Sequence, residues 1–367
     1  VILAVDGAGA FRQAYELSSN SRTFDSFLSI ALVGRQVGVH VVITADRMAS
    51  IPASLAAAIS QRLTLRTADE SELGVAGLSL SSFDPTAPPG RGYLGQDEVQ
   101  VGVLGDGGDA GIAAQLEAMS KLARSMSKHG MAVAPRIERL GTHIPLETLP
   151  SSVDGRPALG VSFATLEPVG FTVGGPLVVI GPPASGRTST VELMIASLRR
   201  WRPETEFVYL GNRRSAIAAT GAWRAVEVTP EGITACATQL TQALRTDELD
   251  PSLVTVIIED LPDFVCTDFM NEEGTQQDQA LQELLRAARQ FGLTVITDGE
   301  PASFRQSMPL LTEARSTRHG IALQPDVTDG DSVFSTSFPT LSRSEFPEGR
   351  GMYVRAGKVH RVQVAQI

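Results

Sequence analysis

The stretch from Gly181 to Thr188 (GPPASGRT) constrains the fold of this chain more than any other part of the sequence. A short apolar run, PLVVI, leads straight into it, and residues 187–200 behind it read as a helix. The pattern fits G-x-x-x-x-G-K-[ST], the phosphate-binding loop between a strand and a helix, except that Arg187 stands where lysine is expected. In such a loop, backbone N–H groups surround phosphate oxygens at the positive end of a helix dipole. The residues expected around a nucleotide are Gly181, Ser185, Gly186, Arg187, Thr188 and Ser189, with the Thr188 hydroxyl on Mg²⁺.

Arg187 weakens the expectation of catalysis. The lysine of such a loop is a compact charge that binds phosphate, whereas arginine is planar and bulkier and does not replace it. Two interpretations follow from this residue. Either the loop binds nucleotide and hydrolyses it very slowly, or it keeps its shape without any nucleotide.

A second element is the apolar run VTVII, which is followed directly by Glu259 and Asp260. A buried strand that carries an acid at its end is how phosphate-loop enzymes hold Mg²⁺. The usual order is Asp and then a Glu that polarises water, and here the order is reversed. Aligning Phe11 with Phe264 puts Glu259 at the metal position, while aligning the following helices without a gap puts Asp260 there. Both residues are therefore candidates for catalysis and metal binding, and a solvated acidic pair is the structural alternative.

The chain also contains an internal repeat, which weighs heavily in any fold prediction. RQVG before HVVIT matches RQFG before LTVIT, and PGRGY matches PEGRGMY. Asp6 after VILAV matches the acidic pair, but Gly7 follows it, so this copy has no second carboxylate. Thr44 and Thr297 end the next strands, where each is either a γ-phosphate sensor or a strand cap. We expect an α/β fold with three parts: the C-terminal part of one copy without its loop (1–105), a helix and linker (106–156), and one complete copy (157–367).

Composition narrows the functional classes. The net charge of −10 argues against broad nucleic-acid binding, because affinity for phosphate backbones comes mainly from Lys and Arg. Two cysteines form no disulfide framework, which makes a reducing cytosol the default. No apolar run approaches the roughly 18 residues of a membrane span, and we expect no signal peptide from these residues. Since the chain begins with Val1 inside an apolar run, we expect it to be a fragment of a longer protein.

With these residues in view, the chain resembles the FtsK/SpoIIIE group of P-loop motors, and most closely the tandem ATPases of type VII (ESX) secretion, the EccC/EssC type. The segments that carry the resemblance are VILAVDGAGAFR, GVHVVITADRMASIPASLAAAISQRLTLR, PPGRGYLGQDEVQVGV, HIPLETLP, ALGVSFATLEPVGF and GRGMYVRAGKVHRVQVA. The resemblance implies RecA-like domains and a motor at the cytoplasmic face of the cell membrane, anchored through an N-terminal part outside this chain. It also implies ATP and Mg²⁺ as ligands, secreted substrate proteins and other secretion subunits as partners, and a hexamer in the full-length protein. Downstream domains of this type have altered loops and act in substrate engagement and regulation.

Two rival functions remain at this point. One is a DNA translocase of the same group, which the acidic balance and the altered loop disfavour. The other is a non-catalytic scaffold that binds peptides. For peptide binding, the candidate residues are Phe304, Met308 and Leu311, which lie at or near helical spacing, and their structural alternative is the core face of a helix.

Three arginines are candidates for arginine fingers that reach a neighbouring subunit's nucleotide. They are Arg47, Arg91 and Arg350. The alternative for each is a solvated surface charge.

Overall fold

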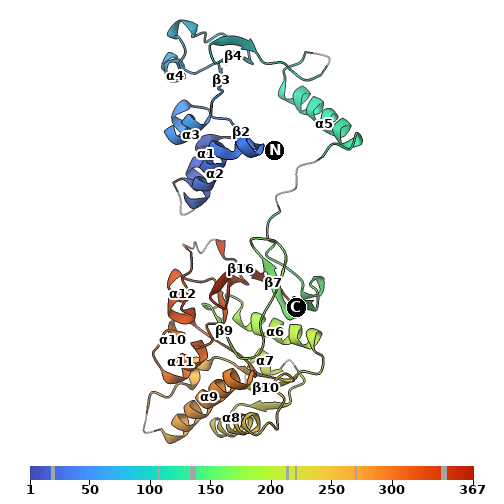
Figure 1. Cartoon of the computed structure of the whole chain (residues 1–367), viewed down its shortest axis with the longest axis vertical. Helices are drawn as coiled ribbons and strands as arrows, with labels where there is room; N and C mark the ends of the chain where they lie inside the picture. The colour runs from blue at the N-terminus through green and yellow to red at the C-terminus, as the bar shows by residue number, and fades with distance from the viewer. Residues whose placement is uncertain are drawn as a thin grey trace. The chain divides into compact units, whose positions relative to one another are not determined.

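The computed structural model describes residues 1–17, 21–105, 108–132, 138–211, 215–219, 221–268, 271–339 and 345–367, without the side chain of Arg22. The chain divides into two compact units, Val1–Arg136 and Ile137–Ile367 (Figure 1). The expected boundary at 105/106 adjoins residues 106–107, which lie outside the described residues, as do residues 133–137 of the expected helix and linker.

The first unit contains a short parallel pair of strands. β1 (Ile2–Val5) pairs with β2 (His40–Ile43) in the register Ile2↔His40 to Val5↔Ile43, so the apolar runs VILAV and HVVIT form neighbouring strands. Three helices accompany this pair: α1 (Ala8–Tyr15), α2 (Ser21–Val33) and α3 (Ala53–Ala58). Their small core is built on Phe24, Phe27 and Leu55, which are almost fully buried.

A separate antiparallel sheet follows in the same unit. Its strands are β3 (Leu63–Leu65), β4 (Arg91–Leu94) and β5 (Asp97–Gln100), in that order. Two helices complete the unit, α4 (Glu70–Val75) and α5 (Ile112–Lys128). The apolar residues of α5 remain exposed, and the helix buries none of its side chains.

The second unit is built on an 11-stranded sheet formed by its described residues. The order is β11-β10-β12-β13-β9-β14-β15-β16-β7-β6, with β8 paired to β7. The strands from β11 to β14 are parallel, and β14 to β7 are antiparallel. Their bounds are β6 (Ser152–Val153), β7 (Arg156–Ser162), β8 (Pro168–Gly170), β9 (Pro176–Ile180), β10 (Glu206–Leu210), β11 (Ala225–Glu227), β12 (Val254–Ile258), β13 (Thr294–Gly299), β14 (Gly320–Leu323), β15 (Arg350–Arg355) and β16 (Lys358–Val364).

Helices cover both faces of this sheet (Figure 1). They are α6 (Arg187–Trp201), α7 (Ala216–Ala219), α8 (Pro230–Arg245), α9 (Glu272–Phe291), α10 (Pro301–Phe304), α11 (Pro309–Arg315) and α12 (Val327–Phe334). Among the helices of the described residues, none combines the length and the apolar character that a membrane span requires.

The central parallel strands β9, β12 and β13 are buried on both sides, which explains their continuous apolar sequences. Along β9, Val178 and Ile180 join the core that includes α8, α9 and α11, whereas Leu177 and Val179 join the core that includes α6. This alternation follows from the two-residue period of a strand. It fixes which side chain of each strand faces α6, and so which side chains reach the loop that precedes α6.

The segment 138–156, which we expected to be part of a linker, packs on the second unit. Leu146 and Leu149 are buried in the core around α6. Pro145 forms a parallel bridge with Gln366, where the Leu146 N–H donates to the Gln366 carbonyl at 2.7 Å. The apolar residues of HIPLETLP account for this packing. The segment has no regular secondary-structure period, but the burial of its apolar side chains holds it on the second unit.

Candidate functional site

The glycine-rich loop lies where the sequence predicted it, between β9 and α6. It follows the carboxyl end of β9, between its parallel neighbours β13 and β14, which is the edge where ligands bind in open α/β sheets. Two glycines are required for its shape. Gly186 has φ +91°, and a Cβ on Gly181 would lie 2.3 Å from the Ser185 Oγ.

The loop presents backbone donors as an anion site does. Gly186 caps α6 without any side-chain hydrogen bond, and the first N–H groups of a helix have no intrahelical acceptor. The side chains of Thr188 and Ser189 are exposed, whereas the buried Ser185 Oγ has no hydrogen-bond partner among the described residues. These features fit a phosphate group and an accessible Thr188 hydroxyl.

Arg187 does not fit that reading, because its guanidinium is engaged by carboxylates. Its Nη1 lies 3.2 Å from Asp260 Oδ1 and 3.5 Å from Asp298 Oδ2, and the side chain is only 18% exposed. The Asp260 N–H also donates to Asp298 Oδ1 at 3.0 Å. The cation that the pattern places against phosphates is thus held by two acids of the same chain.

Asp298 is the residue that the sequence reasoning missed. Its side chain is 6% exposed. The pKa of its carboxyl is raised to about 7, mainly by burial and to a smaller extent by the charges of Asp260 and Glu259, while the Asp260 N–H and Arg187 oppose the shift. Near neutral pH this carboxyl therefore exists in both protonation states.

Thr297, which was expected as a γ-phosphate sensor, does not face the loop; the next residue, Asp298, does. Thr297 pairs with Ile258 and is almost fully buried, and its hydroxyl has no partner among the described residues. Because side chains alternate along a strand, Thr297 shares the face of Val295, and Asp298 shares the α6 face of Ile296. It is Asp298 that contacts Arg187.

The first unit repeats part of this geometry. The Gly7 N–H donates to Thr44 Oγ1 at 2.9 Å, just as the Asp260 N–H donates to Asp298. Gly7 and Asp260 also share a left-handed conformation, with φ values of +80° and +49°. Thr44 further hydrogen-bonds to the carboxylate of Asp6. By this pattern Thr44 corresponds to Asp298.

The same correspondence pairs Asp6 with Glu259. Of the two alignments considered from sequence, it matches the one that pairs Phe11 with Phe264. Glu259 accepts a hydrogen bond from the Tyr209 hydroxyl, and its N–H donates to the Leu210 carbonyl at 3.1 Å. Asp260, in contrast, is half exposed and turned to Arg187.

No cluster of three His, Cys, Asp or Glu side chains in the described part of the chain is placed to hold a metal ion. Mg²⁺ commonly takes one or two carboxylates together with substrate phosphates. A Mg²⁺ ion at Thr188 and Glu259 would accordingly need the phosphates of a nucleotide.

The loop is supported from the far end of the chain. The Gly349 N–H donates to the Ser185 carbonyl at 3.1 Å, and Gln363 Nε2 donates to the Glu348 carbonyl at 3.0 Å. Arg350 donates through Nε to Gln363 Oε1 at 3.1 Å, and through Nη2 to the carbonyls of residues 140 and 141 at 3.2 Å each.

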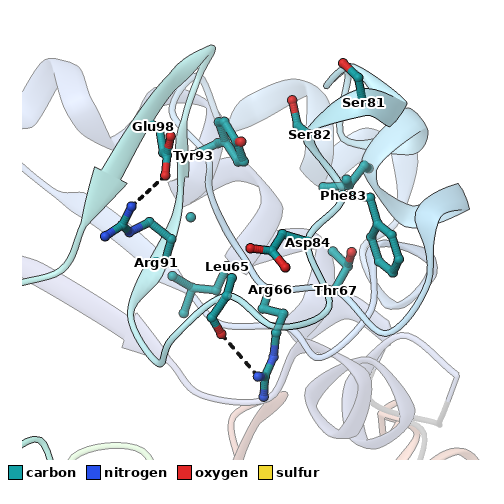
Figure 2. Close-up of a pocket in the computed structure, with 13 residues that line it drawn as sticks. Leu65, Arg66, Thr67, Ser81, Ser82, Phe83, Asp84, Arg91, Tyr93 and Glu98 are labelled. Carbon is teal, nitrogen blue, oxygen red and sulfur yellow. Dashed lines mark hydrogen bonds and ion pairs between the residues drawn. The ribbon is translucent and has the colours of Figure 1, made fainter.

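The arginine-finger hypothesis is therefore wrong for Arg350, which is buried and hydrogen-bonded within its own unit. Arg91 pairs with Glu98 at 2.8 Å on the wall of a pocket in the first unit (Figure 2). Arg47 is exposed.

The pocket that Arg91 lines has a volume of about 230 Å³, and Arg66, also on its lining, donates to the Ala87 carbonyl at 3.2 Å. The guanidinium groups of Arg66 and Arg91 already have acceptors, so this pocket is not a preformed anion site.

The expected peptide-binding face is corrected by the structure. Phe304 on α10 and Leu311 on α11 are fully buried, and Met308 is half-buried against the same core. The apolar spacing there reflects burial against the sheet, which is the ordinary outcome for an amphipathic stripe.

Comparison with known proteins agrees with this geometry. No family model matches the chain. It is 25% identical over 226 residues to the ESX secretion system protein EccC of Thermomonospora curvata, covering 59% of this chain and 17% of that protein. The chain thus spans about a sixth of the length of this curated relative.

Two solved structures are similar over the whole chain. ATPases 2 and 3 of Thermomonospora curvata EccC, in complex with a signal sequence peptide, match with a TM-score of 0.66 and 20% identity, over 68% of that chain. ATPases 2 and 3 of EssC from Geobacillus thermodenitrificans match with a TM-score of 0.67 and 17% identity, over 71% of that chain. The resemblance to EccC/EssC ATPases and the P-loop ATPase fold are both confirmed.

Proposed function

We propose that this chain is an ATPase-derived module of a type VII secretion motor, whose second unit binds ATP with Mg²⁺ and hydrolyses it very slowly. The observation that carries the proposal is the convergence of three elements at one edge of the sheet. The loop after β9, Glu259 and Asp260 after β12, and Asp298 on β13 all meet there.

Each residue has a part in the proposed site. The backbone donors of Gly186 to Ser189 surround the phosphates, with Gly181 and Ser185 shaping the loop. Thr188 and Glu259 flank Mg²⁺, which supplies positive charge to the phosphates when bound. We choose Glu259 as the metal acid over Asp260 because it shares the position of Asp6.

Slow hydrolysis follows from the charges around the loop. Arg187 is committed to Asp260 and Asp298. Loss of one well-placed charge in the transition state costs about 10²–10³ in rate. The reversed order of Glu259 and Asp260 removes the usual acid that orients water.

For the domain organisation, we propose that residues 1–105 are the C-terminal part of another copy of the same domain. The shared hydrogen bonds of Gly7 and Asp260 support this. We propose that the complete copy, residues 157–367, includes the packed segment 138–156 as its leading edge.

We further propose that the module engages secreted substrate proteins and other secretion subunits at the cytoplasmic face of the membrane, within a hexamer. The related EccC structure holds a signal sequence peptide. Phe304 and Leu311, which we expected to bind a peptide, are fully buried, so the peptide-binding surface is not assigned to these residues.

Nucleotide binding tests this proposal through the tryptophans of the full chain. Trp201 and Trp223 both lie in the second unit. A ligand at 100 times its Kd stabilises the folded state by about 2.7 kcal/mol. We expect MgATP to raise the midpoint of the tryptophan-reported thermal transition, and steady-state turnover to stay below about 1 s⁻¹, the low end of typical enzymes.

Thr188→Ala is expected to abolish the shift. Thr328→Ala is its matched control, because Thr328 is also an exposed second residue of a helix. No shift with MgATP would contradict the nucleotide site and favour the non-catalytic peptide scaffold, which the engaged Arg187 also supports. Salt-sensitive binding that grows with DNA length would favour a translocase.

A further inference from the structure

Around the Arg187 guanidinium, negative charge exceeds positive charge. Asp260 and Asp298 both contact its Nη1. Glu259 precedes Asp260 at the end of β12, and Asp263 lies in the next turn, the 3₁₀ helix Leu261–Phe264. A nucleotide would bring further negative charge to this edge of the sheet.

We propose that Asp298 lowers the affinity of the loop for phosphates: with Asp260, it holds Arg187 against the protein and so competes with phosphates for the one guanidinium of the loop. This inference rests on the proposed nucleotide site. It assigns to Asp298 an effect on phosphate affinity, distinct from the slow hydrolysis proposed above.

The carboxylate of Asp298 is fixed from two sides. Its residue pairs with Val179 on β9, the strand that leads into the loop. Oδ1 accepts the N–H of Asp260, and Oδ2 faces Arg187. The Asp260 backbone lies in the left-handed region, with φ +49°, and its N–H holds the Asp298 carboxylate beside Arg187.

The first unit shows that the charge is separable from the fold. Thr44 accepts the corresponding N–H from Gly7 with an uncharged hydroxyl. An uncharged oxygen therefore suffices to accept this N–H, and in the first unit the same hydroxyl also donates to Asp6. The negative charge of Asp298 is an addition, and its one cationic contact is Arg187 among the described residues.

Binding of inorganic pyrophosphate and of MgADP to the full chain tests the proposal. Asp298→Asn keeps an oxygen for the Asp260 N–H and removes the charge. We expect it to bind pyrophosphate about tenfold tighter than the wild type, equivalent to about 1.4 kcal/mol. Asp298→Thr, patterned on Thr44, is expected to do the same and serves as a second variant if the first folds poorly.

Two controls separate this effect from a general change of charge. Asp263→Asn removes a neighbouring carboxylate that makes no ion pair with Arg187, so its gain is expected to be smaller. Adding Arg187→Gln to Asp298→Asn is expected to cancel the gain, because the effect runs through the guanidinium.

The competing outcomes are distinct. Wild-type binding as tight as that of Asp298→Asn overturns the role of Asp298 and leaves the nucleotide site intact. A gain that survives Arg187→Gln, or that Asp263→Asn equals, also overturns it. No binding by any variant overturns both this inference and the proposed nucleotide site.

Discussion

Replacing Arg187 with methionine is expected to destabilise the second unit at alkaline pH and to change it little at about pH 6. The reason is the protonation of Asp298, whose pKa burial raises to about 7. At about pH 6 the carboxyl is mostly neutral and needs no cation. At about pH 8.5 it is ionised in the wild type and relies on Arg187, which lies 3.5 Å away.

The sign follows from proton linkage. An unfolded Asp has a pKa of about 3.9, so the folded state binds this proton more strongly, and stability is lost as pH rises through the folded pKa. Removing Arg187 raises the folded pKa of Asp298 further. Keeping the carboxyl neutral one and a half units above pH 7 costs about 2 kcal/mol, at about 1.36 kcal/mol per unit.

The assay is urea unfolding of the full chain followed by tryptophan fluorescence, which reports only the second unit. The double variant Arg187→Met/Asp298→Asn is the control, and its destabilisation is expected to be independent of pH. An equal loss in the single variant at both pH values would refute the reasoning, since it would mean that Arg187 acts by packing.

Two further predictions use the same fluorescence assay, and a third uses limited proteolysis. Burial lowers the pKa of His319 to about 4, so the wild type loses about 3 kcal/mol as pH falls from about 6.5 through 4, and His319→Gln is expected to flatten this loss. A Leu311→Ala variant is expected to cost about 2–5 kcal/mol because Leu311 is fully buried, and a cost near zero would contradict the core assignment. Finally, Arg350→Leu removes the donor to the carbonyls of Leu140 and Gly141. Each carbonyl that stays buried without a donor is expected to cost about 1–3 kcal/mol of stability. Unchanged protease resistance of residues 138–145 would argue that Arg350 does not hold this segment in place.

Much of the fold followed from short-range patterns. The loop sequence sets the strand, the turn and the start of α6 because its glycines and its apolar lead-in are local requirements. The pairing of VILAV with HVVIT was predictable because both are short apolar runs in an alternating pattern.

The candidate site was harder to predict than the fold, because a shift of one residue along a strand moves a side chain to the other face of the sheet. Matching HVVIT to LTVIT made Thr44 the partner of Thr297. Yet Thr44 follows Arg35 of RQVG at the same spacing as Asp298 follows Arg289 of RQFG. The turn that both copies share, where Gly38 and Gly292 have φ of +79° and +81°, was the better reference point for the alignment.

Burial could not be read from spacing alone. Phe304 and Leu311 have the same pattern whether a helix faces a partner or its own sheet, and here they face the sheet. Likewise, nothing local showed that Leu146 would pack against α6, because its partners lie far away in the sequence.

The support of the glycine-rich loop is made of main chain. The Ser185 carbonyl receives the N–H of Gly349, and the Ser185 N–H reaches the Pro182 carbonyl. Apart from the requirement for glycine at Gly181 and Gly186, such contacts do not depend on which side chains the loop carries. A P-loop can therefore carry arginine in place of lysine, and the surrounding sequence can change widely, while the loop keeps its backbone conformation. Loss of hydrolysis need not change the shape of such a loop.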